Sequence, residues 1–446
     1  MRITVVGAGK VGYSVAQYLA REDHDVVVIE QNEERRNIIQ NSLDVMAIEG
    51  NGASPSLLAH PHVKGTEVFI AVTANDEINM VACRVAKDAG LGFTMARIRS
   101  DDYMGAGGSQ GHTFLKNMGV DMAVNTDFVM AQEISRILQI PSALEVEDFA
   151  GGRIRLLEIR MTGDSPWIDK PLKDLALPAN VLVVGILRLG QMIIPNGNDI
   201  LRVYDNVFFI GAPESLEALS EKRLRTLSRV ENVMIIGAGR TGRYLALALE
   251  NKGMMVKVID QQESRCKEVA KHLKRGKVFH GTGTDGELLS QERVGEADAV
   301  ICLTRDDELN LLLALLAKDY GAKRTFVRVG QPEYIALMEK VGVDVVLSPR
   351  LTIAEVILRK IHQGKFTTLA LLEGAKASAL EIKVAMGSRV LGKKLKDVKL
   401  PRYCLVGGVL RQNTVIVPNG DTVLQWDDKV IIFALPDLIN KIEKYF

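Results

Sequence analysis

The chain has 446 residues, of which 47% are hydrophobic and 25% are charged, a profile typical of a soluble globular protein. A chain of this length is expected to fold as several domains rather than around one core. Its 56 Lys and Arg residues balance 55 Asp and Glu residues to a formal net charge of +1, so the charge gives no support to nucleic-acid binding.

The first hundred residues alternate short apolar runs with helical segments. We expect the runs to be strands, at Ile3–Gly7, Asp25–Glu30, Val68–Thr73 and Thr94–Ile98. Continuous Val and Ile runs bounded by glycines indicate a parallel sheet covered by helices on both faces. The chain runs directly into its first strand, so we expect no signal peptide. No stretch reaches the roughly 20 apolar residues that a membrane span needs.

A glycine loop follows the first of these strands. It has the G-x-G-x-x-G pattern and reads Gly7-Ala8-Gly9-Lys10-Val11-Gly12. The first glycine permits a tight turn, the second lets backbone amides approach a phosphate, and the third packs the helix against the strand. Glu30 ends the next strand, at the place where a carboxylate receives ribose hydroxyl groups. The sequence therefore predicts a nucleotide-binding crevice.

Three further positions are expected at the same crevice. Asn51 follows the third strand, Thr73 ends the fourth and Arg97 ends the fifth. Ligands of open α/β sheets bind at the carboxyl ends of the strands, which is why these side chains are candidates. For Arg97, an ion pair within the fold is the structural alternative.

The rest of the first half no longer alternates strands with helices. A helix at Asp127–Ile140, ended by Pro141, is expected to leave the sheet as a crossover. A strand-rich module with Pro-Asn-Gly turn chemistry follows, at about Leu144–Ala218.

The second half repeats the first. Nine of the 22 aligned positions in Phe69–Gly90 and Val300–Gly321 are identical, so we infer a duplication. The glycine loop recurs as Gly237-Ala238-Gly239-Arg240-Thr241-Gly242. The remaining crevice positions have the equivalents Asp260, Thr282, Thr304 and Arg328, with Asp260 at the same spacing from its loop as Glu30. The crossover helix is expected again at about Leu351–Gln363.

The difference in residue number between equivalent positions of the two halves becomes smaller before the strand-rich modules begin. Thr73 aligns with Thr304, whereas further along the chain Gly119 aligns with Gly342 and Leu172 with Leu395. The first half therefore carries eight extra residues. The Gly-rich segment Met104–Gly111 is the expected insertion, a surface loop of high conformational entropy.

The charged residues of the two crevices indicate the class of ligand. The carboxylates of Glu30 and Asp260 repel a 2′-phosphate and so favour NAD(H) or adenine nucleotides over NADP. Lys10 and Arg240 occupy the same loop position, where a cation is placed to neutralise terminal phosphates. A solvated loop charge is the alternative for each.

The sequence shows no catalytic signature. It has no G-x-S-x-G motif, no P-loop lysine and no cluster of general acid and base, so we predict no catalytic residue. The four Cys and seven His show no metal-ligand spacing, so no metal site is predicted, and the cysteines are expected to be reduced in the cytosol. The alternatives to a regulator are an NAD-dependent oxidoreductase with tandem Rossmann halves and a scaffold with vestigial sites.

The repeated motifs resemble a known family. The G-A-G-x-x-G modules, the Thr73–Asn79 and Thr304–Asn310 segments, and Ala96–Ser100 resemble RCK (KTN) domains. The strand-rich modules, with their Leu-Lys-Asp and Pro-Asn-Gly sequences, resemble RCK C-terminal domains. This resemblance to the tandem RCK family implies two Rossmann-like doubly wound parallel-sheet domains, each followed by a small α+β RCK C-terminal domain. The expected domain limits are 1–141, 142–220, 230–364 and 365–446.

The resemblance also implies a function. Members are non-enzymatic regulators that bind NAD(H) or ATP/ADP on the cytoplasmic face of the cell membrane. The implied partner is a potassium-translocating membrane protein of the TrkH type, and the implied assembly is a homo-oligomeric RCK ring, with a tetramer expected. A nucleotide would gate the transporter by shifting this ring between conformations. Either nucleotide class is compatible with either half.

Overall fold

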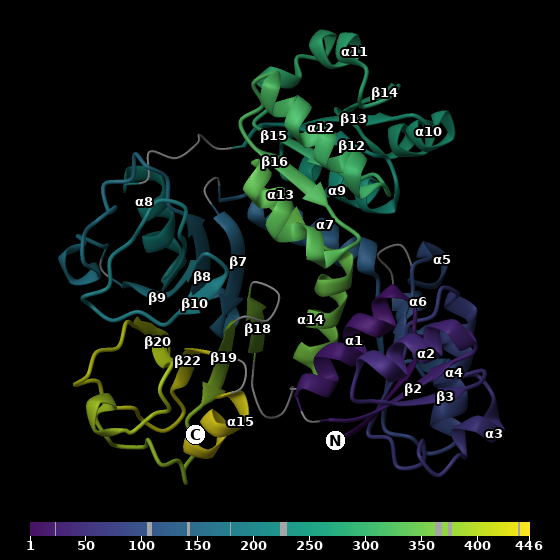
Figure 1. The fold of residues 1–446 in the computed structure, drawn as a ribbon, viewed down its shortest axis with the longest axis horizontal. Coiled ribbons are helices and arrows are strands. Elements are labelled where there is room, and N and C mark those ends of the chain that lie inside the picture. Colours follow the sequence, from purple (N-terminus) through teal and green to yellow (C-terminus); the bar gives the residue numbers. More distant parts are fainter. Residues whose placement is uncertain are drawn as a thin grey trace.

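The computed structural model of the chain describes residues 1–22, 24–104, 109–140, 143–178, 180–223, 230–361, 368–372, 377–435 and 438–446. Within these residues the chain forms two six-stranded parallel sheets and two five-stranded antiparallel sheets (Figure 1). The expected domain limits at 141 and 364, and residues 105–108 of the Gly-rich insertion, fall outside the described residues.

The first parallel sheet has the strand order β3-β2-β1-β4-β5-β6, which is the Rossmann order. Its strands are β1 Arg2–Val6, β2 Asp25–Glu30, β3 Met46–Glu49, β4 Val68–Ala71, β5 Phe93–Arg97 and β6 Met122–Val124. Its helices are α1 Lys10–Arg21, α2 Glu33–Ser42, α3 Pro55–Leu58, α4 Asp76–Asp88, α5 Asp101–Met104 and α6 Ser109–Asn117. The central strands are buried on both faces, which explains their continuous apolar sequences.

The second parallel sheet repeats this order as β14-β13-β12-β15-β16-β17. Its strands are β12 Asn232–Ile236, β13 Met255–Asp260, β14 Lys277–His280, β15 Ala299–Cys302, β16 Thr325–Arg328 and β17 Val345–Leu347. Its helices are α9 Arg240–Asn251, α10 Glu263–His272, α11 Gly286–Gln291, α12 Asp307–Asp319 and α13 Ile335–Val341. The predicted fold class, two doubly wound parallel sheets, is confirmed.

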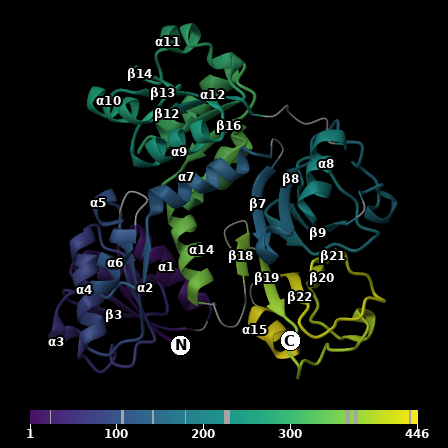
Figure 2. The same cartoon turned by 180° about the vertical axis from the view of Figure 1, so that it is seen from behind.

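The two crossover helices are exchanged between the halves. Helix α7, Thr126–Ile137, leaves the first sheet and packs on α9 of the second half, and α14, Pro349–Ile361, leaves the second sheet and packs on α1 of the first (Figures 1 and 2). One shared core joins Met130, Ala131 and Ile134 of α7 to Leu245, Ala246 and Leu249 of α9. The other joins Ile353, Ala354 and Ile357 of α14 to Val15, Ala16 and Leu19 of α1. Each half therefore completes its core with a helix of the other.

The two antiparallel sheets have equivalent orders, β10-β9-β11-β8-β7 and β21-β20-β22-β19-β18. The first comprises β7 Ala143–Phe149, β8 Ile154–Arg160, β9 Val181–Arg188, β10 Gln191–Ile193 and β11 Asn206–Gly211, and is followed by α8 Pro213–Arg223. The second comprises β18 Thr368–Leu372, β19 Ala377–Lys383, β20 Cys404–Arg411, β21 Thr414–Ile416 and β22 Lys429–Ala434, and is followed by α15 Ile439–Ile442. The predicted small α+β C-terminal modules are confirmed.

These two sheets pack against each other through a common core. The rings of Phe208 and Phe433 meet across it, with 5.6 Å between their centroids. Close approach depends on glycine, because a Cβ atom on Gly185 would lie 2.7 Å from the Phe433 ring. The chain is thus a pair of similar halves joined twice, by exchanged helices and by facing sheets.

Candidate nucleotide-binding crevices

The first glycine loop connects β1 to α1. Gly7 has a φ of +97°, a backbone conformation that favours glycine, and Gly9 is the N-cap of α1. A Cβ atom on Gly12 would lie 1.7 Å from the carbonyl oxygen of Gly7, so this position also excludes a side chain. The free amides of the first turn of α1 face the end of the loop, where an anion is stabilised.

The second glycine loop, between β12 and α9, has the same construction. Gly237 has a φ of +117°, Gly239 is the N-cap, and a Cβ atom on Gly242 would lie 2.0 Å from the carbonyl oxygen of Gly237. Lys10 and Arg240 are exposed at the first position of α1 and α9. Both halves therefore hold a loop that can bind phosphate.

The two predicted acids face their loops. The Ala8 amide donates to Oε2 of Glu30 over 2.5 Å, and the Ala238 amide donates to Oδ2 of Asp260 over 2.7 Å. The second oxygen of each carboxylate accepts from a backbone amide two residues later. These bonds fix both carboxylates at the loop, and each oxygen keeps a further lone pair for a ribose hydroxyl group.

The threonines lie just beyond the ends of β4 and β15. The hydroxyl of Thr73 donates to Oδ1 of Asn79, and the hydroxyl of Thr304 donates to Oδ1 of Asn310, both over 2.7 Å. Each asparagine amide donates in turn to the carbonyl group that ends the next strand, at Arg97 (2.8 Å) or Arg328 (2.9 Å). These two fully buried asparagines tie adjacent strand ends together.

Asn79 and Asn310 were not among the predicted site residues. The sequence did distinguish these two asparagines, because they form one of the identical pairs in the aligned segments Phe69–Gly90 and Val300–Gly321.

The strand-end arginines are largely withdrawn from solvent. Burial lowers the pKa of the Arg97 guanidinium and of the Arg328 guanidinium, and nearby carboxylates act against this effect. Arg328 donates to the Thr304 carbonyl oxygen over 3.0 Å, whereas the Nε of Arg97 is buried and has no hydrogen-bond partner among the described residues. A buried donor without a partner is a place where an anionic ligand would add a hydrogen bond.

The loops after β3 and β14 close over the sheets. Oδ1 of Asn51 accepts from the Ala53 amide over 2.9 Å, so this side chain shapes its own turn. Thr282 accepts from the Thr284 hydroxyl over 3.4 Å. A Cβ atom on Gly52 would lie 2.2 Å from Val6, so the backbone there passes directly over the end of β1.

In each half, the glycine loop, acid, threonine and arginine come together at the carboxyl ends of neighbouring strands. The order of the strands places β1 between β2 and β4, and the chain reverses its direction of winding at this point. Open α/β sheets bind ligands at such a switch point. In the described part of the chain no group of three or more His, Cys, Asp or Glu side chains is arranged to hold a metal ion.

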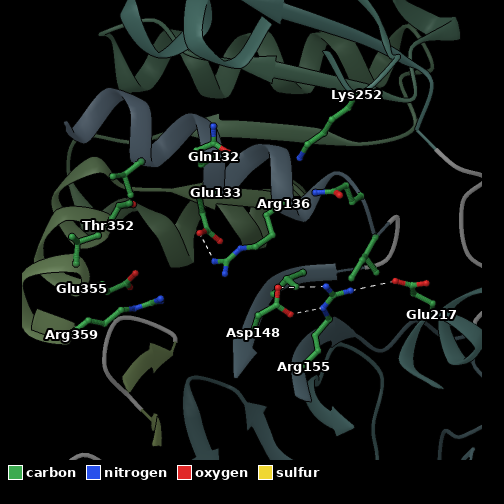
Figure 3. A pocket seen from close by; sticks show the side chains of 15 residues that line it. Gln132, Glu133, Arg136, Asp148, Arg155, Glu217, Lys252, Thr352, Glu355 and Arg359 are labelled. Carbon is green, nitrogen blue, oxygen red and sulfur yellow. Dashed lines mark hydrogen bonds and ion pairs between the residues drawn. The ribbon is translucent and has the colours of Figure 1, made fainter. Parts of the chain in front are cut away.

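A second feature is a charged cavity of about 520 Å³ where the exchanged helices meet the first antiparallel sheet (Figure 3). Glu133 and Arg136 reach it from α7, and Glu355 and Arg359 reach it from α14 (Figure 3). Its other charged lining residues are Asp148, Arg155, Glu217 and Lys252.

The charged side chains buried beside the cavity are hydrogen-bonded to one another. Glu147 of β7 accepts hydrogen bonds from Arg136 and Arg359, one on each crossover helix. Burial acts to raise the pKa of Glu147, but Arg359 and Arg136 outweigh it and hold this pKa below its usual value. Burial raises the pKa of Glu355 to about 8, with the neighbouring carboxylates Glu147 and Glu133 adding to the effect.

Glu355 is therefore expected to make stability depend on pH. Its pKa is about 8 in the folded chain and about 4.5 when unfolded, so its contribution is fully present below pH 4.5 and is lost as pH rises toward 8. In Glu355→Gln this dependence disappears. Between pH 5 and 8 the variant should gain on the order of 3 kcal/mol relative to the parent. Denaturant unfolding at several pH values measures the difference, and a constant difference would contradict the assignment. Gln132, the equivalent residue of the first half, shows that an amide fits this position.

The TrkA-N domain family matches residues 3–126 and 233–349, and the TrkA-C domain family matches residues 156–224 and 379–446. The Trk system potassium uptake protein TrkA homolog 1 of Methanosarcina mazei is 35% identical over 455 residues, covering 100% of both chains. The TrkA homolog of Archaeoglobus fulgidus is 36% identical over 446 residues, again covering 100% of both.

A solved structure shares the architecture. The GsuK channel bound to NAD superposes with a TM-score of 0.62 at 18% identity, covering 100% of this chain and 78% of the other. At this identity the similarity shows a common fold. Among the described residues, no helix has both the length and the apolar character needed to cross a bilayer.

Proposed function

The chain belongs to the TrkA family of Trk system potassium uptake proteins, and we infer that it is a regulatory, nucleotide-binding subunit of a potassium transporter rather than an enzyme. The observation that carries this inference is the matched geometry of two glycine loops, each with a carboxylate bonded to the loop backbone. The full-length relatives are potassium uptake proteins, which disfavours an oxidoreductase.

The ligand in each crevice is proposed to be NAD(H) or ATP/ADP. Its phosphates would lie against the amides at the start of α1 or α9, with Lys10 or Arg240 beside them. Its ribose hydroxyl groups would bind Glu30 or Asp260, and the strand-end Arg97 or Arg328 would compensate phosphate charge. The third-strand loops, with Asn51 and Thr282, and the paired Thr73 and Thr304 would complete the walls of the crevices.

The partner is proposed to be a potassium-translocating membrane protein of the TrkH type, bound from the cytoplasmic side. We propose that the chain assembles into an RCK ring, a tetramer in the simplest arrangement. A nucleotide can shift such a ring between two conformations only by binding one of them more tightly. The exchanged helices give this shift a physical route, because movement of one half carries a helix of the other.

Replacing Asp260 with alanine tests the proposed site. The variant should bind nucleotide in the second half at least about tenfold more weakly, because it loses the ribose contact and the anchor of the Ala238 amide. Calorimetry with NADH, ADP and ATP on the full chain measures the affinity. Glu30→Ala is the matched variant of the first half, and the two should weaken different binding events. Unchanged affinity in Asp260→Ala would refute the site. Potassium flux through the reconstituted partner should lose its response to the nucleotide bound there.

A further inference from the structure

Helix α7 of the first half touches the glycine loop of the second half. Oδ1 of Asp127, in the first turn of α7, accepts a hydrogen bond from the Thr241 hydroxyl over 2.7 Å. Thr241 is buried, follows Arg240 in the loop and belongs to the first turn of α9. A carboxylate from one half therefore stands beside the phosphate-binding helix end of the other.

This contact is held firmly in place. Asn125 caps α7 by accepting from the Phe128 amide over 3.0 Å, and its side-chain amide donates to the Tyr244 hydroxyl over 3.2 Å. Tyr244 and Arg243 of α9 both bind the carboxylate of Asp101, again from the first half. The start of α7 is thus fixed on the start of α9, and Asp127 cannot swing away freely.

The contact exists for one crevice and not for the other. Alignment of the two halves makes Asp127 equivalent to Arg350, and Thr241 equivalent to Val11. Valine has no hydroxyl group to donate, and arginine has no carboxylate to accept. The two crevices, alike in their loops and acids, therefore differ in the residue that the opposite half contributes.

Asp127 also acts on the arginines of both crevices. Burial lowers the pKa of Arg97 and of Arg328, and in each case Asp127 is among the carboxylates that act to raise the pKa again. The Asp127 carboxylate therefore already compensates part of the positive charge that the two arginines would offer to a phosphate ligand. The same carboxylate offsets the positive end of α9.

From this geometry we propose that Asp127 is a specificity-determining residue supplied by the first half to the nucleotide crevice of the second. Its charge disfavours ligands with additional phosphate charge at the α9 loop, so the second crevice selects a dinucleotide of the NAD(H) class over a nucleoside triphosphate. The inference rests on the proposed nucleotide site in the second half. A triphosphate carries more negative charge than a dinucleotide pyrophosphate, so it meets the greater repulsion.

Asp127→Asn tests the charge while keeping an oxygen that can accept from Thr241. In a Glu30→Ala background, which weakens the first crevice, the Asn variant should bind ATP about tenfold more tightly and change NADH affinity by less than about threefold. The gain should shrink at high salt, because screening weakens the repulsion that has been removed. In an Asp260→Ala background the change in selectivity should be smaller, because only the effect of Asp127 on Arg97 of the first crevice remains.

Thr241→Val is the matched control, because it removes the hydrogen bond and keeps the charge of Asp127. It should leave the ratio of ATP to NADH affinity unchanged. Equal shifts for ATP and NADH in Asp127→Asn, or no shift, would overturn the proposal. So would a selectivity change in Thr241→Val that matches that of Asp127→Asn. If Glu30→Ala and Asp260→Ala leave all binding unaltered, the proposed nucleotide sites themselves fail, whatever Asp127→Asn does.

Discussion

Glu147→Ala is expected to lower the free energy of unfolding by about 3–5 kcal/mol. Glu147 is almost fully buried and accepts from Arg136 over 3.1 Å and from Arg359 over 2.5 Å. Its removal leaves two guanidinium groups competing for the remaining carboxylates in a poorly hydrated place. The loss is large because breaking a buried ion pair strands its partner, although forming one adds little.

The midpoint of denaturant unfolding measures this loss. Glu217→Ala is the matched control, because its carboxylate pairs with Arg155 over 3.3 Å but is mostly exposed, and its removal should cost under about 1 kcal/mol. Since Glu147 joins α7 to α14, amide exchange in both crossover helices should also accelerate in Glu147→Ala. Equal losses of unfolding free energy in the two variants would show that the buried cluster stabilises the fold no more than an exposed ion pair does.

Gly242→Ala is expected to abolish nucleotide binding in the second half and to cost about 3 kcal/mol of stability. The added Cβ atom would lie 2.0 Å from the carbonyl oxygen of Gly237, and backbone cannot move aside as a flexible side chain can. Helix α9 must therefore shift away from β12, which opens the loop and disturbs its packing under α7.

Gly239→Ala separates the two effects. Gly239 has a φ of −65°, and a Cβ atom there would meet no atom of the described residues within 4 Å, so the fold should keep its stability. Binding should still weaken, because a phosphate that approaches the backbone closely would meet the new methyl group. Calorimetry and thermal unfolding of the two variants measure both quantities. A Gly242→Ala protein with parental stability and affinity would contradict the loop geometry.

Local patterns in the sequence were enough to predict where the glycine loops, the two acids and the strand ends lie in the fold. The glycine loops, the acids at Glu30 and Asp260, and the strand ends at Arg97 and Arg328 each depend on a short stretch of chain with one stable geometry. The duplication supported the prediction further, because every one of these features appears twice in the same order. Helix ends were predicted less well. The helix expected to reach Ile140 ends at Ile137, since Pro141 sets only a limit that a helix cannot pass.

The exchange of the crossover helices could not be predicted in the same way. The apolar face of α7 shows that the helix is covered, but it does not show which sheet covers it. Because the halves are similar, either sheet offers a comparable surface, and the choice depends on three-dimensional geometry. The contacts that follow from the exchange, from Asp127 to Thr241 and from Glu147 to Arg359, join residues 114 and 212 positions apart. No local pattern reports such pairs.

The exchanged helices also bear on how a duplicated chain can diverge. In a dimer of identical subunits, each mutation appears on both sides of the interface at once, so a change that suits one site is imposed on the other. Here the two sides are encoded separately, and they have drifted apart at equivalent positions, with Asp127 opposite Arg350 and Gln132 opposite Glu355. Fusion of two copies into one gene thus allows selection to tune one crevice to its ligand and leave the other unchanged.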